Sequence, residues 1–276
     1  MAATRGLEGD ALFSTRPGEL GTLARRSVLE GADLLVVVGG DGSVNEVANG
    51  LAGVDGAEIA VIARGTGWDF VRTYGIPHDV EGAIDVALHG ATRTVDLGRV
   101  TYRAWEGHDA EAYFANVASA GMSGAIAQRA NETTKALGGK ASYALATFVV
   151  FARWHTSDIR VSVDSEIRGG RMHDVVVANG KFFGGGMKIC PDAEPDDGLF
   201  DVLMLGDLSK RDLVANMPKL YRGTHLPHPK AELLRGASVT VDSEQPLPIE
   251  LDGEQPGTTP VRFEVVPRAL RLRVPR

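Results

Sequence analysis

An acidic residue, Asp41, stands among three glycines in the segment GGDGSVNEV, directly after the apolar run LLVVV at 34–38. Glycines between a strand and a helix leave backbone N–H groups free to bind an anion, which the helix dipole also favours. A carboxylate there would repel a bare polyphosphate, so it is best explained by a phosphate that arrives with Mg²⁺. The alternative is a tight turn in which Asp41 only accepts backbone hydrogen bonds.

A second glycine turn, RGTGWDF, follows the next apolar run, IAVIA. Between the two turns, apolar residues recur with the i, i+3, i+4, i+7 spacing of a helix face. Ser43 and Glu46 have capping-box spacing, which predicts that this helix begins at Ser43. A strand, a helix and a strand at this separation predict a parallel βαβ unit, whose ligands bind beyond the carboxyl ends of the strands. We therefore expect Asp41 and Asp69 to lie at neighbouring strand ends.

The length and spacing of the apolar segments change near residue 97. Short apolar or alternating segments such as IRVSVD, MHDVVVANG and VRFEVV follow, separated by Gly, Pro, Asp and Asn, as in an antiparallel β domain. One helical interlude is expected at 123–153. The predicted fold class is α/β: a nucleotide-binding βαβ domain at 1–97, incomplete at its N-terminus, and a β-sandwich-like domain at 98–276.

Composition narrows the classes of function. A net charge of −7 and a pI near 5.5 argue against a nucleic-acid partner, which would favour a basic field. The longest apolar stretch, at 141–154, is shorter than the roughly 20 residues that span a bilayer. No signal peptide is recognisable at the start. The single cysteine, Cys190, excludes an intrachain disulfide and is expected to be a packing residue. A cytoplasmic protein is predicted.

Four ordered segments carry a family resemblance. GGDGSVNEVANGL resembles the signature of the diacylglycerol kinase catalytic family, which includes bacterial lipid kinases and sphingosine kinases. RGTGWDFVRTYGIP resembles that family's G-T-x-x-D-F-A-R segment, with Trp68 where asparagine or a small residue is common. NGKFFGGGMKICPDAEPDDGLFD and ELDGE resemble two later segments. The resemblance covers the chain from Thr15 to the C-terminus.

The start of the chain departs from the family pattern. Family members usually begin with a strand and a further glycine loop for the nucleotide phosphates, and no such segment precedes STRPGEL here. We expect the coding start to lie further upstream, because a parallel sheet without its first strand has an exposed edge. If the short form is genuine, weak ATP binding is expected.

The resemblance implies an ATP site. Its glycine loop and the residues that follow it hold the nucleotide phosphates in the family, Thr66 contacts the nucleotide, and STRPGEL places Thr15 near it. The implied residues are Thr15, Gly39, Gly40, Asp41, Gly42, Ser43, Asn45 and Thr66.

The resemblance also implies catalytic and metal-binding residues. Asp41 and Asp69 would belong to the acid and water network around a catalytic Mg²⁺, and Glu254 would be the general base that takes the proton from the acceptor hydroxyl. Composition alone would make Glu254 an exposed turn residue, since Asp-Gly is a hairpin signal. A second metal site would use a carboxylate and two carbonyls, by position those of Asp197, Glu194 and Leu199.

The function that the resemblance implies is an ATP- and Mg²⁺-dependent lipid kinase, acting on a hydroxyl of diacylglycerol or a sphingoid-like lipid. A soluble-metabolite kinase of the NAD kinase type and a non-catalytic module that senses lipids or nucleotides are the alternatives. A lipid substrate implies peripheral contact with a membrane surface, for which the apolar stretch at 143–154 is one candidate, although such a helix is more often core. An exposed sheet edge could support a homodimer.

Overall fold

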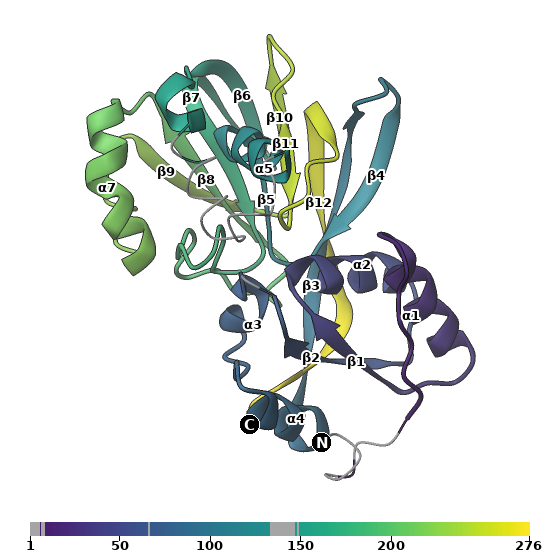
Figure 1. Ribbon diagram of the computed structural model, residues 1–276. Coiled ribbons are helices and arrows are strands. Elements are labelled where there is room, and N and C mark those ends of the chain that lie inside the picture. Colours follow the sequence, from purple (N-terminus) through teal and green to yellow (C-terminus); the bar gives the residue numbers. More distant parts are fainter. Residues whose placement is uncertain (1–5, 7–8, 66, 133–146, 148) are drawn as a thin grey trace.

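The computed structural model describes residues 6, 9–65, 67–132, 147 and 149–276. Within these residues, one twelve-stranded sheet runs through two lobes, and the long strands β3 (Ala91–Ala104) and β12 (Gly257–Val274) extend from one lobe into the other (Figure 1). The central strand order is β1-β2-β12-β10-β6-β7-β5-β11. The expected α/β fold class, with a sandwich-like second part, is confirmed.

The N-terminal lobe contains the predicted βαβ unit. Strands β1 and β2 pair in parallel, with Val36 opposite Ala60, and α2 connects them. Every residue of β2 is buried, because helices and β12 surround it. The helices and strands of this lobe are α1 (Glu19–Leu29), β1 (Leu34–Gly39), α2 (Asp41–Leu51), β2 (Glu58–Ala63), α3 (Asp69–Thr73) and α4 (Val80–His89).

The C-terminal lobe is built from antiparallel pairs. Its core contains Phe114, Phe200 and Phe263, whose rings pack with centroids 5.5 and 6.1 Å apart. Cys190 is buried, as predicted for a packing residue. Besides β3 and β12, the elements are β4 (Asp109–Phe114), β5 (Val117–Gly121), α5 (Met122–Glu132), β6 (Ser157–Val163), β7 (Glu166–Ala178), β8 (Phe200–Gly206), α7 (Lys210–Arg222), β9 (Ala231–Gly236), β10 (Ser238–Ser243) and β11 (Ile249–Leu251).

The two lobes share β3 and β12. The boundary expected at residue 97 falls inside β3, and the end of β12 returns to the N-terminal lobe, where Leu272 pairs with Ile59 of β2. Leu270 and Leu272 are buried in the core of that lobe. The last residues of β12 therefore belong to the sheet and the core of the N-terminal lobe.

The capping-box prediction is wrong. Helix α2 begins at Asp41, with Gly40 as its N-cap and no side-chain cap. The carboxylate of Glu46 accepts a hydrogen bond of 3.1 Å from the backbone N–H of Leu20 at the start of α1. The reason is close helix packing: a Cβ on Gly21 would lie 3.3 Å from the Cα of Gly50, so α1 starts beside Glu46.

The apolar stretch that was expected to be helical is described in part. Helix α5 covers the beginning of the expected interlude, and residues 147 and 149–153 are also helical. Residues 133–146 and 148, which include five of the twelve residues of the candidate membrane-contact stretch at 143–154, lie outside the described residues. Among the described helices, none combines the length and apolarity needed to cross a membrane.

Candidate active site

The two glycine turns meet at the carboxyl ends of β1 and β2. A Cβ on Gly65 would lie 2.6 Å from the Cα of Gly40, so the two backbones touch and neither position has room for a side chain. A Cβ on Gly39 would lie 2.3 Å from the hydroxyl of Ser43. These glycines are therefore needed for space, since none of Gly39, Gly40 and Gly65 has a positive φ.

Asp41 connects the first turn to the second. Its carboxylate accepts hydrogen bonds from the backbone N–H groups of Asp69 (3.4 Å) and Phe70 (3.1 Å), at the start of α3. The structure thus shows the backbone-acceptor arrangement that was the alternative interpretation of Asp41, and it also brings Asp41 next to Asp69. Trp68, the N-cap of α3, has a φ of 60°, a left-handed conformation that asparagine tolerates better than tryptophan.

Asp69 is a buried acid with both oxygens engaged. One oxygen accepts from the Arg72 guanidinium at 3.0 Å, and the other accepts from the backbone N–H of Gly185 at 2.7 Å. Burial raises the pKa of Asp69 to about 6, and the nearby charge of Asp41 acts in the same direction. Gly185 lies in the GGGMK segment of the other lobe, so Asp69 links the two lobes.

Asp41 and Asp69 converge over Gly67. A Cβ on Gly67 would lie 2.5 Å from a carboxylate oxygen of Asp41 and 3.9 Å from one of Asp69. The two acids therefore lie at neighbouring strand ends, as predicted. Two carboxylates beside a glycine turn of this kind fit Mg²⁺, which proteins commonly hold through one or two carboxylates together with phosphates and waters.

Glu254 approaches the same place from the end of the chain. It follows β11 in a turn closed by backbone hydrogen bonds between Leu251 and Glu254 of 2.8 and 2.9 Å. Its carboxylate lies 4.0 Å from the position that a Cβ on Gly42 would take. Glu254 is exposed, as its hairpin context suggests, and it faces the first turn of α2. Because Gly42 has no side chain, the space between them is open.

Asp252 holds this turn in place, and the sequence reasoning missed it. One of its oxygens accepts from the N–H of Ala115 (2.7 Å) and the side chain of Asn45 (3.0 Å). The other accepts from the N–H groups of Asn116 and Val117, each at 3.0 Å. The residue is also in the left-handed region, with a φ of 49°. Only its place in the ELDGE segment could have pointed to it.

The side chain of Asn45 is bonded to other groups of the protein, and its contact with a nucleotide stays a prediction. Its side chain donates to Asp252 and, at 3.1 Å, to the carbonyl of Tyr113, so the amide faces the C-terminal lobe instead of the glycine turn. Asn49, one helical turn later, donates to the same carbonyl at 2.8 Å and accepts from the N–H of Tyr113 at 2.8 Å. The two asparagines join α2 to β4 because they share one helix face.

Two further residues, Thr15 and Thr66, were expected to contact the nucleotide. The N–H and hydroxyl of Thr15 donate to Glu19 at 2.6 and 3.0 Å, which fixes the start of α1. Thr66 lies outside the described residues. Contact of either residue with a nucleotide stays a prediction.

The loop at 194–199, for which the resemblance implies a second metal, is held by hydrogen bonds and an ion pair within the protein. Asp197 accepts from the N–H of Leu199 at 2.9 Å and forms an ion pair with Arg235, and the carbonyl of Glu194 accepts from the N–H of Asp197 at 3.4 Å. The buried Asp96 accepts from the N–H of Gly198 at 2.8 Å. In the described part of the chain, no three His, Cys, Asp or Glu side chains are grouped to hold a metal. The metal role of this loop stays a prediction.

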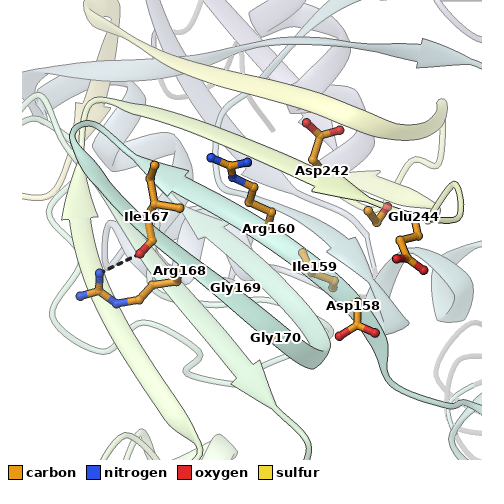
Figure 2. Close-up of a pocket in the computed structure, with 10 residues that line it drawn as sticks. Asp158, Ile159, Arg160, Ile167, Arg168, Gly169, Gly170, Asp242 and Glu244 are labelled. Atoms are coloured by element: carbon orange, nitrogen blue, oxygen red, sulfur yellow. Dashed lines mark hydrogen bonds between the residues drawn. The ribbon is translucent and has the colours of Figure 1, made fainter.

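A separate hollow of about 450 Å³ lies on β6, β7 and β10. Figure 2 shows its lining side chains, among them Arg160, Arg168 and Asp242. None of the predicted site residues lines it, and its strands present mixed charges to solvent. We assign it no part in the candidate site.

Two buried acids lie behind the Glu254 turn. Glu250 accepts from the N–H of Gly253 and, at 3.2 Å, from the hydroxyl of Ser119. Asp174 accepts from the N–H of Ser123 at 3.0 Å and from the Ser123 hydroxyl. Burial raises the pKa of Glu250 well above its usual value and raises the pKa of Asp174 to about 7.

The raised pKa of Asp174 makes stability pH-dependent. The folded chain keeps the proton up to about pH 7, whereas the unfolded chain releases it near the ordinary value of 3.8. The free energy of unfolding should therefore fall as the pH rises from about 4 to about 7, by on the order of a few kcal/mol. Asp174→Asn should flatten this slope in urea titrations, and Asp158→Asn, at an exposed position, should leave it unchanged. Equal slopes for wild type and Asp174→Asn would contradict the assignment.

Two family models match the chain. Residues 1–100 match the diacylglycerol kinase catalytic domain, and residues 116–274 match the YegS C-terminal NAD kinase beta sandwich-like domain. A diacylglycerol kinase of Staphylococcus saprophyticus is 30% identical over 259 residues, which cover 94% of this chain and 82% of the relative. A diacylglycerol kinase of Staphylococcus carnosus is 28% identical over 272 residues, 98% of this chain and 86% of that one.

Solved structures show the same fold. A crystal structure described as a diacylglycerol kinase from Bacillus anthracis superposes with a TM-score of 0.71 at 20% identity. The match covers 95% of this chain and 84% of that one. It includes both lobes, so their arrangement around the shared strands is a property of the fold.

Proposed function

Because this chain belongs to the diacylglycerol kinase catalytic domain family, we propose that it is an ATP- and Mg²⁺-dependent lipid kinase. In this proposal the γ-phosphoryl group of ATP passes to a primary hydroxyl of diacylglycerol or of a sphingoid base. The observation that carries the proposal is the meeting of Asp41, Asp69 and Glu254 around the two glycine turns.

The glycine turn supplies the phosphate site. Helix α2 starts directly after Gly40 without a side-chain cap, so its first N–H groups and its dipole are directed at the turn. The bare Gly42 leaves open space between these groups and Glu254. A phosphoryl group held there would lie between the helix N-terminus and a carboxylate.

Asp41 and Asp69 would supply the carboxylate ligands of the metal. When bound, Mg²⁺ neutralises the charge on the phosphates and polarises the group that is transferred. Arg72 and the N–H of Gly185 fix the orientation of Asp69 before any ligand arrives. Such preorganisation matters because phosphoryl transfer depends mainly on positioning and charge stabilisation.

Glu254 would be the general base. It reaches the turn from the C-terminal lobe, and an acceptor hydroxyl between Glu254 and the phosphate could pass its proton to this carboxylate as the new P–O bond forms. The buried Glu250 and the partly buried Asp252 hold the turn from both sides. The base therefore belongs to the lobe opposite to the phosphate site.

We place the enzyme in the cytoplasm, where ATP is available, in peripheral contact with a bilayer that contains its substrate. The edge of β1, where Val38 is 62% exposed, is the proposed contact of a homodimer. A soluble-metabolite kinase is the second candidate, because the family model that matches residues 116–274 is described as an NAD kinase beta sandwich-like domain.

A direct assay separates these functions. The purified chain is incubated with γ-labelled ATP and Mg²⁺ and with diacylglycerol, sphingosine or NAD in separate reactions, the lipids being in detergent micelles. We expect label in a lipid, and loss of labelling in Asp41→Asn but not in the exposed control Asp158→Asn. Label in NAD alone would favour the soluble-metabolite kinase. Binding of nucleotide with no labelled product would favour a sensing module.

A further inference from the structure

Helix α7 is cationic in an acidic chain. Its thirteen residues, KRDLVANMPKLYR, contain four lysines and arginines and one acid, whereas the whole chain has a net charge of −7. The acid, Asp212, closes a capping box with Ser209, where it accepts from the N–H and the hydroxyl. Its charge is therefore satisfied at the helix N-terminus, and the rest of the helix is positive.

The outer face of α7 is apolar at its centre. Val214, Pro218 and Tyr221 recur at i, i+4 and i+7 and are exposed, Val214 to 63% and Tyr221 to 52%. Within α7 only Leu213 is buried. Leaving two large apolar side chains in water on one face has no benefit for the fold itself, since their burial would be favourable.

Positive side chains flank this apolar strip. Arg211, Lys219 and Arg222 are exposed, and none of them forms an ion pair with another described residue. Lys210, by contrast, donates to the carbonyl of Ala152. We call the surface formed by Arg211, Val214, Pro218, Lys219, Tyr221 and Arg222 the α7 face.

The α7 face is connected to the candidate active site. The carbonyl of Leu220 accepts a hydrogen bond of 2.9 Å from the N–H of Lys188, at the end of the GGGMK segment. Three residues earlier in the same segment, the N–H of Gly185 donates to Asp69. The helix forms the outer flank of the C-terminal lobe in Figure 1, and this one segment links it to Asp69.

We propose that the α7 face docks the protein on an anionic phospholipid bilayer. This inference rests on the proposed lipid kinase activity, and it assigns the membrane contact to a surface other than the apolar stretch at 143–154. An apolar strip inserts among the headgroups while flanking lysines and arginines attract anionic lipid, as in interfacial helices. Charge complementarity selects this occupant: the cationic face of a second copy would be repelled, whereas an anionic leaflet attracts it.

Vesicle sedimentation tests the proposal without any turnover. The full chain is mixed with vesicles of phosphatidylglycerol and phosphatidylcholine, or of phosphatidylcholine alone, at low and high salt. We expect binding to the anionic vesicles only, weakening with salt. Lys219→Gln with Arg222→Gln should weaken it about thirtyfold, since each cation near an anionic surface contributes roughly fivefold. Arg160→Gln with Arg276→Gln, two exposed arginines elsewhere, is the matched control.

A second variant tests the apolar strip. Val214→Ser with Tyr221→Ser should also reduce vesicle binding, and thermal unfolding of each variant shows whether it remains folded. The proposal is overturned if wild type does not prefer anionic vesicles, if the control pair loses as much binding as the α7 pair, or if these serine substitutions convert a dimer in solution to a monomer. Vesicle binding without lipid phosphorylation would reject the proposed function and retain the docking surface.

Discussion

Glu254→Gln is expected to lower kcat of the proposed lipid kinase reaction by about 10²- to 10⁴-fold, the usual contribution of a general base. The amide keeps the shape of the side chain and cannot take the proton. Glu254 is exposed and its backbone is fixed by its bonds to Leu251, so the fold should be unaffected. KM for ATP should change little, because the phosphates would be held by α2 and the metal.

A matched control isolates the chemistry from the loss of a surface charge. Glu244→Gln removes an exposed carboxylate from another turn, after β10, and should leave kcat unchanged. Turnover of Glu254→Gln within about twofold of wild type would reject Glu254 as the base. A loss confined to KM would instead indicate that Glu254 helps to bind the acceptor or the metal.

The local part of the site could be predicted from the sequence. The two apolar runs, each followed by a glycine turn with an acid, predict parallel strands whose carboxyl ends meet, and the structure brings Asp41 and Asp69 together over Gly67. The prediction succeeds because the spacing of apolar residues in a helix or strand, and the glycine that ends a strand, are visible in a short stretch of sequence. The contact of Gly40 with Gly65 supplies the physical reason for those glycines.

The long-range part could not be predicted in this way. Glu46 has the correct spacing for a cap of its own helix, but it caps α1, because the packing of Gly21 on Gly50 decides which N–H groups lie near it. Asn45 follows the glycine turn in sequence, and its amide binds Asp252, more than two hundred residues later. The first partner depends on how α1 packs on α2 and the second on how the two lobes are joined, and local sequence spacing predicts neither.

Asp252 holds the start of β5 and, through Asn45, links the C-terminal lobe to α2. Its two oxygens accept hydrogen bonds from two backbone N–H groups between β4 and β5, from the N–H of Val117 at the start of β5, and from one side chain of α2. Burial raises the pKa of this carboxyl, because moving the charged group out of water is unfavourable. The hydrogen bonds from these donors offset that desolvation. The same residue lies two positions before Glu254. The anchor that joins the lobes therefore also sets the position of the proposed base.

Asp252→Ala is accordingly expected to destabilise the fold by about 3–5 kcal/mol, because buried donors lose their acceptor and alanine is strained at a φ of 49°. Asp164→Ala is the matched control: Asp164 has the same φ of 49° and also accepts from two backbone N–H groups, at 3.2 and 2.9 Å, but on an exposed hairpin. Urea unfolding should give the control a cost of about 1–2 kcal/mol. Equal costs for the two variants would mean that burial and the bond to Asn45 add nothing.

If Asp252 also positions the base, Asp252→Asn, which tolerates the left-handed backbone, should retain more stability than Asp252→Ala while still losing kcat.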